Sequence, residues 1–190
     1  DAGVIIPLDD YFERFGWDKR FPEWVKQDVT YNGSIYSLPS EVTMVGVYYN
    51  KAIFKDLGLS VPATYEEFLA VAKTCKDAGV LPIILSSQNQ WNTFHYESMF
   101  FSSFAGREGV GAVLNGKSGF DQPVFGRALD AFQDLIKKGY TQETPNAWSY
   151  DDANTAFKSG DGAMRFTGSW MINDYVTDMG DNVGFFTLPG

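Results

Sequence analysis

Residues 47–68, VYYNKAIFKDLGLSVPATYEEF, decide the fold because almost every residue in this stretch has a predictable structural role. The β-branched and aromatic residues around its start predict a strand over residues 43–49. Asn50 can then cap a short helix, and Gly58 can end it, because glycine adopts the left-handed conformation that closes a helix. The stretch therefore begins as a strand followed at once by a helix.

A second helix is predicted after this stop. Pro62 cannot continue the first helix, and Thr64 with Glu67 forms the Thr-x-x-Glu capping box that starts a new one. This helix ends at Gly79, and residues 80–85 follow as a short apolar strand. Its apolar face consists of Phe68, Val71, Ala72 and Cys75. Strand, helix and strand together predict a βαβ unit, and hence a parallel strand pair.

Short helices and strands continue along the chain. Asn32-Gly33 predicts a two-residue hairpin turn. Pro123 suits the first turn of a helix that ends at Gly139, and Ser149 can cap a helix that runs to Lys158. The expected apolar face of the helix that starts at Pro123 is Phe125, Leu129, Phe132 and Ile136. The other expected helices cover residues 8–15, 21–25, 94–105 and 170–179, and the other strands cover 163–166 and 183–188.

The composition restricts the class of protein. Of the 190 residues, 44% are apolar and 21% are charged, as in an ordinary globular protein. The net charge of −9 disfavours nucleic acid and anionic membranes as partners, because both attract basic surfaces. The single cysteine, Cys75, excludes an internal disulfide and a cysteine-rich metal site. Aromatic residues reach 16%, which leaves rings available for a ligand surface.

Enzyme motifs are not found. The sequence contains no Gly-x-Ser-x-Gly, no dinucleotide fingerprint and no phosphate loop. Its one cysteine and one histidine fall on separate predicted helices, and the pairs Asp9-Asp10 and Asp151-Asp152 are interpreted as acids in the first turns of helices. We therefore expect no catalytic residue, no cofactor and no metal site.

The opening stretch also resembles a known family. Its Tyr-Asn-Lys, Phe, Leu-Gly and Pro-x-Thr-aromatic-Glu-Glu-Phe pattern is similar to the segment that identifies extracellular solute-binding proteins of sugar importers, the group that includes maltose-binding protein. Later motifs resemble the same family in consistent order: Ala156-Phe157, Gly160, Gly162-Ala163-Met164, Gly168-Ser169-Trp170, Gly184-Phe185 and Leu188-Pro189.

This resemblance implies an α/β fold: a periplasmic-binding-protein-like lobe of type II, with a mainly parallel sheet flanked by helices and a remnant of the other lobe. Residues 1–42 would be the tail of the first lobe and the first hinge, residues 43–183 the second lobe, and residues 184–190 the return hinge strand. The abrupt ends at Asp1 and Gly190 lead us to expect the middle fragment of a longer protein.

The resemblance also implies a function. A sugar or oligosaccharide would bind between two lobes and be delivered, without catalysis, to the membrane subunits of an ABC importer. The location would be extracellular or periplasmic, with a lipid anchor on the full-length protein as a further expectation. Apolar side chains left by a missing lobe, such as Phe12, Phe21 and Trp24, lead us to expect that they are covered either by the second lobe or by another copy of the fragment through self-association.

Three tryptophans are the main candidates for contact with the sugar. Trp170 follows a predicted strand and resembles the family tryptophan that stacks on a sugar face, although it could also cover a helix start. Trp91 lies in the polar segment after the strand of residues 80–85, where a packed surface tryptophan is the alternative. Trp148 corresponds to an aromatic position of the family, and a hydrophobic staple before Ser149 is the alternative.

Polar candidates surround these rings. Glu41 falls where related proteins place a hinge-region acid, and it could equally be an exposed loop carboxylate. The amides around Trp91 suit the recognition of hydroxyl groups, and His95 is the only histidine. The amide candidates are Gln88, Asn89 and Asn92, and Arg165 and Asp152 are weaker candidates for the same rim.

Two other classes of function stay open. Aromatic platforms with carboxylates such as Glu41 and Glu97 also suit a glycosidase, which needs two acids that flank the scissile bond. The acidic surface also suits a binding protein for a cationic solute such as a polyamine.

Overall fold

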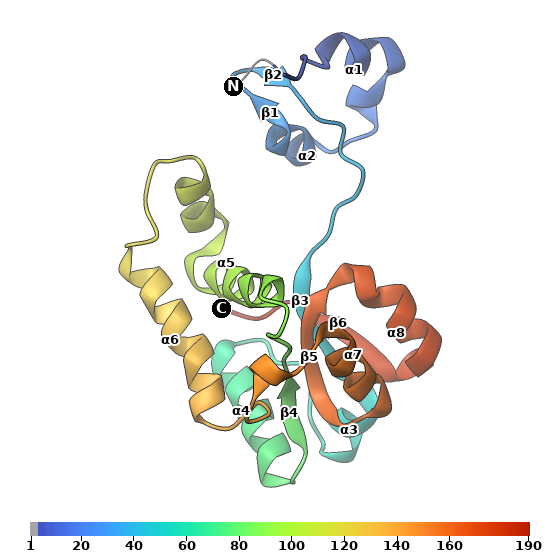
Figure 1. The fold of residues 1–190 in the computed structure, drawn as a ribbon, viewed down its shortest axis with the longest axis vertical. Coiled ribbons are helices and arrows are strands. Elements are labelled where there is room, and N and C mark those ends of the chain that lie inside the picture. The colour runs from blue at the N-terminus through green and yellow to red at the C-terminus, as the bar shows by residue number, and fades with distance from the viewer. Residues whose placement is uncertain (1–3) are drawn as a thin grey trace. The chain divides into compact units, whose positions relative to one another are not determined.

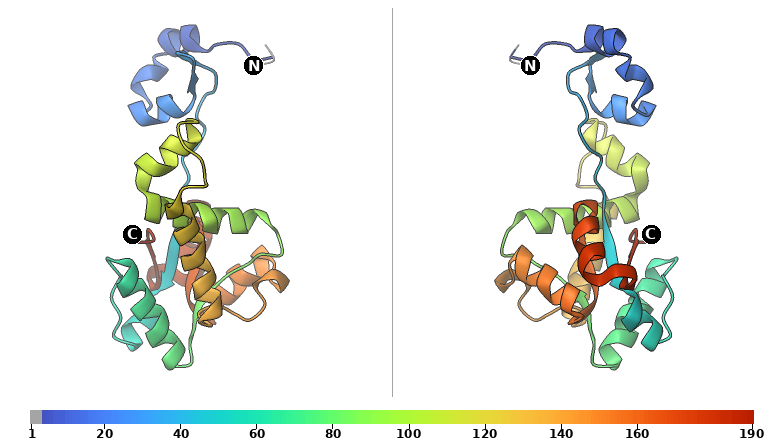
Figure 2. Two further views of the ribbon diagram at one scale, coloured as in Figure 1. Left: turned by 90° about the vertical axis from the view of Figure 1, so that its left-hand side faces the viewer. Right: turned by 90° about the vertical axis from the view of Figure 1, so that its right-hand side faces the viewer.

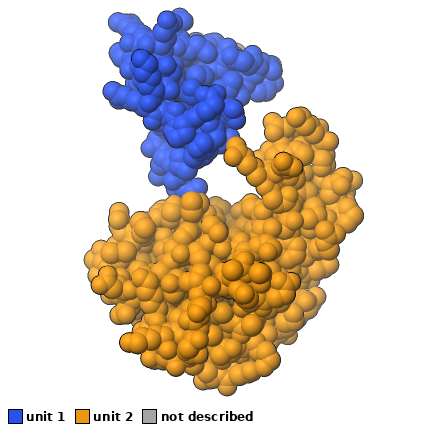
Figure 3. All heavy atoms as spheres, turned by 180° about the vertical axis from the view of Figure 1, so that it is seen from behind, with its two compact units in different colours: residues 1–43 blue, residues 44–190 orange. Residues whose placement is uncertain are grey.

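The computed structural model describes residues 4–190, which form two compact units that divide between Thr43 and Met44 (Figure 3). We refer to residues up to 43 as unit 1 and to residues 44–190 as unit 2. In the part of the chain that the structure describes, no helix combines the length and the apolar character needed to cross a bilayer.

Unit 1 contains two short helices, a 3-10 turn and a hairpin: α1 (Asp9–Phe15), η1 (Trp17–Lys19), α2 (Glu23–Asp28), β1 (Thr30–Tyr31) and β2 (Ser34–Ile35). Asn32 and Gly33 have φ values of 49° and 82°, as the predicted two-residue turn requires. Phe12 is buried and packs against Trp17 and Phe21 of the same unit. Trp24 remains 44% exposed.

Unit 2 is built on a four-stranded sheet with the order β4-β5-β3-β6 (Figure 1). Its strands are β3 (Val45–Asn50), β4 (Leu81–Ile84), β5 (Gly162–Gly168) and β6 (Val183–Phe186). All seven residues of β5 are buried, since β5 lies inside the sheet between β4 and β3. β6 belongs to this sheet and pairs with β3.

The predicted parallel pair of the first two strands of unit 2 is wrong, and so is the expectation of a mainly parallel sheet. β3 runs antiparallel to both β5 and β6, and only β4 and β5 pair in parallel among the strands of the sheet. The two helices predicted between β3 and β4 are present, but β3 and β4 are not neighbours, because β5 lies between them. The apolar runs identify the strands, but they carry no information about which strands become neighbours.

Helices cover both faces of the sheet (Figures 1 and 2). One core contains residues of α4, α5 and α6, and the other contains residues of α7 and α8. The helices are α3 (Lys51–Asp56), α4 (Tyr65–Asp77), α5 (Trp91–Leu114), α6 (Pro123–Lys137), α7 (Tyr150–Ser159) and α8 (Ile172–Met179). Short 3-10 turns occur at Pro145–Ala147, Ser169–Met171 and Gly180–Asn182.

Most helix starts follow the sequence signals. The Asn50 side chain accepts hydrogen bonds from the backbone N–H groups of Ala52 and Ile53 at 3.0 and 3.2 Å, so it caps α3 as predicted. The buried residues of α4 are the four that were predicted. Only half of the predicted capping box of α4 is present. Thr64 Oγ1 accepts from the N–H of Glu67, but the Glu67 carboxylate accepts from the N–H of Ala63 instead of the N–H of Thr64.

α2 covers Glu23–Asp28 instead of residues 21–25, α8 begins at Ile172 instead of residue 170, and α5 and α6 differ more from the prediction. α5 begins at Trp91 instead of residue 94, and a helical segment continues beyond Gly106, whose φ of 65° and ψ of 178° break the helix. The buried face of α6 is Phe125, Ala128, Phe132 and Leu135. Ile136, predicted as buried, is 40% exposed, because the apolar face is rotated towards the small Ala128.

Candidate ligand-binding site

The carboxyl ends of β4 and β5 lie at one edge of the sheet, because these two strands run parallel. The chain leaves β4 and enters α5 at Trp91, and it leaves β5 through a 3-10 turn that contains Trp170. α7 begins close by, since the N–H of Tyr150 donates to Asn89 Oδ1 at 3.4 Å. Three helical segments therefore begin at the same edge.

Four rings from these segments form one group, which we call the ring cluster: Trp91, His95, Tyr150 and Trp170. The centroid of the Trp91 ring lies 4.9 Å from that of Tyr150, 5.2 Å from that of His95 and 6.3 Å from that of Trp170. The centroids of His95 and Trp170 are 5.3 Å apart. The sequence predicted that Trp91, His95 and Trp170 take part in one site, and the structure brings these three side chains together.

Hydrogen bonds fix the position of Tyr150 inside the cluster. Its hydroxyl oxygen accepts from Trp170 Nε1 at 2.7 Å and lies 2.8 Å from Thr167 Oγ1. Because the indole N–H can only donate, the tyrosine hydroxyl is free to donate to the threonine oxygen. Trp170 is thereby held by a bond that uses the polar edge of its ring.

The two indoles remain partly open to solvent. Trp91 is 42% exposed and Trp170 is 39% exposed, while the polar edge of Trp170 is occupied by Tyr150. An indole whose face is open while its N–H is satisfied offers an apolar surface of fixed orientation. Such a surface suits stacking against the C–H face of a sugar ring, whose hydroxyl groups then point outward to polar neighbours.

His95 is partly enclosed by the two indoles. Burial lowers the pKa of His95 below its ordinary value of 6.5. The imidazole is therefore neutral at pH 7, with one nitrogen that donates and one that accepts. A neutral imidazole can exchange hydrogen bonds with hydroxyl groups without introducing a charge into the cluster.

The backbone also accommodates Trp170 closely. A Cβ added to Gly168 would overlap the six-membered ring of Trp170. The backbone of Gly168 is extended, with a φ of −97°, so it is space and not conformation that requires glycine here. The Gly-Ser-Trp motif thus allows the indole to fold back over the end of β5.

Arg165 lies beneath the cluster instead of on its rim, so the prediction of a rim position is wrong. Its side chain is completely buried, and its guanidinium carbon lies 5.4 Å from the centroid of Tyr150. Asn92 is 2% exposed and donates through Nδ2 to Ser86 Oγ at 3.0 Å. Asn92 was predicted in a loop facing the ligand, whereas it forms part of the buried support in the first turn of α5.

Other predicted residues are not members of the ring cluster. Gln88 borders a separate cavity of about 500 Å³ beside the start of α5, lined by Ser87, Gln88, Gln90, Thr93, Phe94, Glu97 and Asn146. Asn89 contributes through its bond to the backbone of Tyr150. Glu41 belongs to unit 1, where it borders a hollow together with residues 37–43 and α2.

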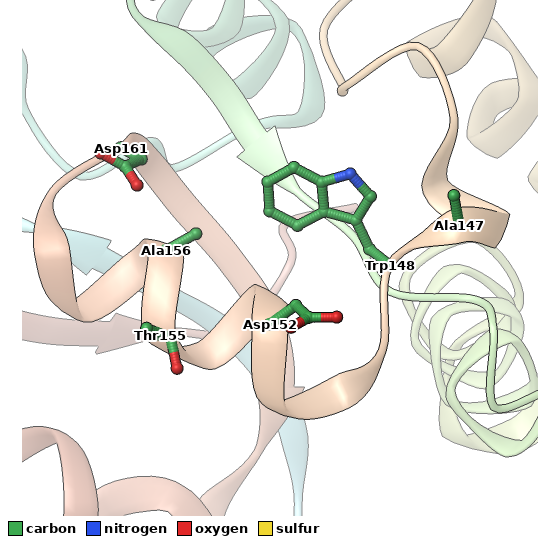
Figure 4. A pocket seen from close by; sticks show the side chains of 6 residues that line it. All are labelled: Ala147, Trp148, Asp152, Thr155, Ala156 and Asp161. Atoms are coloured by element: carbon green, nitrogen blue, oxygen red, sulfur yellow. The ribbon is translucent and has the colours of Figure 1, made fainter.

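Trp148 points into a different cavity of about 420 Å³ (Figure 4). Its other lining residues are Ala147, Asp152, Thr155, Ala156 and Asp161. Asp152 completes a reciprocal capping box with Ser149, and the hydrogen bonds from Ser149 lower the pKa of its carboxyl group. Trp148 also packs against the core beneath α7 and α8. The structure therefore does not bring Trp148 into the ring cluster.

Comparison with known families gives a direct result. The family model of bacterial extracellular solute-binding proteins matches residues 1–190. The chain belongs to this family.

Individual family members are similar over almost the whole chain. A multiple sugar-binding protein of Streptococcus mutans serotype c is 29% identical over 168 residues, which are 84% of this chain and 39% of that protein. The solved structure of a chitin oligosaccharide binding protein is 32% identical, with a TM-score of 0.86 over 99% of this chain and 47% of that one. The SBP RafE in complex with raffinose is 26% identical, with a TM-score of 0.78. The chain thus spans less than half the length of the curated relatives that it matches.

Tyr150 is the member of this solute-binding protein's ring cluster that the sequence did not predict. A signal was available, because Ser149 was recognised as a helix cap and Tyr150 is the first residue of that helix. The missing information was that α7 begins at the edge where β4 and β5 end. That relationship depends on contacts between residues about 60 positions apart in the chain, such as the bond between Asn89 and Tyr150.

Proposed function

We propose that this chain provides one wall of the ligand site of a solute-binding protein, which captures a neutral sugar or short oligosaccharide and delivers it to an ABC importer without altering it. In this proposal residues 43–183 are the second lobe, residues 1–42 are the tail of the first lobe and the first hinge, and residues 184–190 are the return hinge. The observation that carries the proposal is the ring cluster, with two half-open indoles from segments distant in sequence.

The names of the similar proteins support a carbohydrate ligand. The solved structures include proteins described as binding chitin oligosaccharide and raffinose. The family is extracellular, and we propose the same location for this protein, with a lipid anchor as a means of attachment in the full-length form. The importer's membrane subunits are its proposed partners.

A glycosidase is less well supported. Cleavage of a glycosidic bond uses two carboxyl groups a few ångströms apart across the bond. The four members of the ring cluster include no carboxylate, and Glu97 borders a separate cavity. Glu41 belongs to unit 1. Recovery of the intact oligosaccharide after incubation is the expected result, and release of reducing sugar would contradict it.

A cationic solute is also less well supported. The guanidinium carbon of Arg165 lies 5.4 Å from the centroid of the Tyr150 ring, so a second positive charge bound at the ring cluster would be repelled. We therefore expect affinity that changes little with added salt, because a neutral sugar forms no screened ion pair. Affinity for a polyamine that collapses in salt would favour the cationic solute instead.

Tryptophan fluorescence tests the proposal. Chitin oligosaccharide, xylo-oligosaccharide and raffinose are titrated into the chain and into the full-length protein, and a saturable change is expected with at least one sugar. Trp91→Phe and Trp170→Phe should each weaken binding about tenfold or more, about 1.4 kcal/mol. The control is Trp24→Phe, an exposed tryptophan of unit 1, which should change the affinity little. Equal losses in all three variants, or no response to any sugar, would count against the proposal.

A further inference from the structure

Arg165 is a buried cation without an acidic partner. It is 0% exposed, and none of the ion pairs among residues 4–190 includes it. An isolated charge in a protein interior is costly unless its hydrogen-bonding groups are satisfied. Ordinary packing at an interior position of β5 calls for an apolar side chain, such as those of Met164 and Phe166.

The guanidinium instead uses neutral acceptors from several elements. Nη1 donates to Tyr96 Oη and to the Phe166 carbonyl, both at 2.9 Å, and lies 3.3 Å from the Ile84 carbonyl. Nη2 donates to Ser86 Oγ at 2.9 Å, and Nε lies 3.3 Å from Asn154 Oδ1. The planar fork of arginine thus ties β5 to the end of β4, to α5 and to α7, which a lysine could not do with the same geometry.

These partners belong to the segments that carry the ring cluster. Tyr96 follows His95 on α5, and Ser86 also accepts from Asn92, which follows Trp91. The guanidinium carbon lies over the Tyr150 ring, 5.4 Å from its centroid, within the range of a cation–π contact. Tyr150 in turn holds Trp170. Arg165 is therefore linked to Trp170 through Tyr150. It is linked to Trp91 through the ring of Tyr150 and, along the chain, through Ser86 and Asn92.

We propose that Arg165 is the positioning residue of the ring cluster: it sets the separation and tilt of Trp91 and Trp170 without touching the ligand. Its burial excludes direct contact with a sugar in this arrangement. The effect of Arg165 on ligand affinity rests on the proposed function, whereas its effect on the geometry of the rings does not depend on that function.

Circular dichroism tests the geometry in the absence of any ligand. Two indoles with centroids 6.3 Å apart give an exciton couplet, defined here as the far-ultraviolet signal lost in both Trp91→Phe and Trp170→Phe. Arg165→Met and Arg165→Lys should each remove most of this couplet and make the two indoles more accessible to acrylamide. The matched control is Tyr175→Phe, which removes a 2.7 Å hydrogen bond to Asn154 Oδ1 on the far side of the network and should preserve the couplet.

Several outcomes would overturn the proposal. A wild-type chain without the couplet would do so, and so would a folded Arg165→Met or Arg165→Lys variant that keeps it. If Arg165→Met does not fold, Ser86→Ala decides together with Asn92→Ala, because Ser86 Oγ accepts from both Arg165 Nη2 and Asn92 Nδ2. A couplet reduced in Ser86→Ala but kept in Asn92→Ala supports the proposal, and a couplet that is unchanged in Ser86→Ala or equally reduced in both variants overturns it.

Titration with chitin oligosaccharide and raffinose tests the positioning role of Arg165 separately from the proposed sugar-binding function. If the wild-type protein binds either sugar, Arg165→Met should weaken binding about tenfold or more, while Tyr175→Phe should leave it nearly unchanged. Equal weakening by both variants would reduce Arg165 to a general structural role. Loss of the couplet in Arg165→Met without any sugar binding by the wild-type protein would contradict the proposed function and leave the positioning role supported.

Discussion

Trp170 donates its indole N–H to the hydroxyl oxygen of Tyr150 at 2.7 Å, although the two residues enter the site from different elements. Tyr150 starts α7, whereas Trp170 lies in the 3-10 turn after β5. The bond fixes the edge of the indole, and Trp170 remains 39% exposed. The hydrogen bond that holds Trp170 and the space that its ring occupies can be tested separately.

Tyr150→Phe removes the hydroxyl group and keeps the ring. The indole N–H of Trp170 and the Thr167 hydroxyl then lose their partner, which should reduce the free energy of unfolding by about 1 kcal/mol and weaken sugar binding about fivefold. Urea denaturation and fluorescence titration measure the two effects. Tyr31→Phe, at an exposed position of unit 1, is the control and should alter neither quantity. Unchanged affinity in Tyr150→Phe would show that the bond does not hold Trp170 in a productive position.

Gly168→Ala tests the space beneath the indole. The added methyl group would overlap the Trp170 ring, so the ring must move away or the strand end must shift. We expect a loss of about 1–3 kcal/mol in unfolding free energy, as for other overpacked sites, together with a change in Trp170 emission.

The control for this substitution is Gly126→Ala. Gly126 lies on α6 with open space around its Cα, so an alanine there should stabilise the helix by up to about 1 kcal/mol. Equal stability and emission in Gly168→Ala and the wild-type chain would mean that Trp170 does not lie over Gly168 in solution.

Local features of this fold could be predicted from the sequence because they depend on residues close together in the chain. The Asn50 cap, the Asn32-Gly33 turn and the buried face of α4 all involve partners within a few positions. The neighbours in the sheet could not be predicted, because β5 enters between β3 and β4 from a segment more than 70 residues further along. Apolar strands buried on both faces look alike in sequence.

Some residues of the candidate site could likewise be predicted from the sequence, and others could not. Trp91 and Trp170 could be proposed because each directly follows or closely follows a recognisable strand. Arg165 was given the wrong environment, since its nearest partners include Ser86, which is 79 positions away. Nothing in the local sequence distinguishes an arginine that reaches solvent from one that ties four elements together. Trp148 shows the reverse case, because a tryptophan close to the site in sequence points into another cavity.

The pKa of His95 gives a pH dependence. Burial lowers this pKa in the folded state below the ordinary value of 6.5, so the unfolded chain binds more protons at intermediate pH. The contribution of His95 to stability is therefore complete above pH 6.5 and is lost as the pH falls through the lower, folded-state pKa. Denaturation at several pH values should show this loss in the wild-type chain and a smaller one in His95→Gln.

Fluorescence provides a second measure of the same titration. A protonated imidazole in contact with Trp91 and Trp170 should quench their emission, and the quenching should appear at acidic pH only when His95 is present. An acid transition of equal size in His95→Gln would assign the effect to other groups. Asp152 is the first to consider, because hydrogen bonds from Ser149 lower the pKa of its carboxyl group and link it to α7.

Cys75 reports on the opening of the core beneath α4. The thiol is completely buried, and burial raises its pKa to about 11, so very little reactive thiolate is present at neutral pH. A thiol reagent should therefore label the native chain only as fast as the core opens, and labelling should become rapid in denaturant.

The free energy of opening derived from the labelling rate should match that from urea denaturation and should fall in Phe68→Ala, which removes a buried ring from the same core. Phe94→Ala, at a side chain that is 67% exposed, is the control and should leave the labelling rate unchanged. Rapid labelling of the native chain would show that α4 separates from the sheet without unfolding of unit 2.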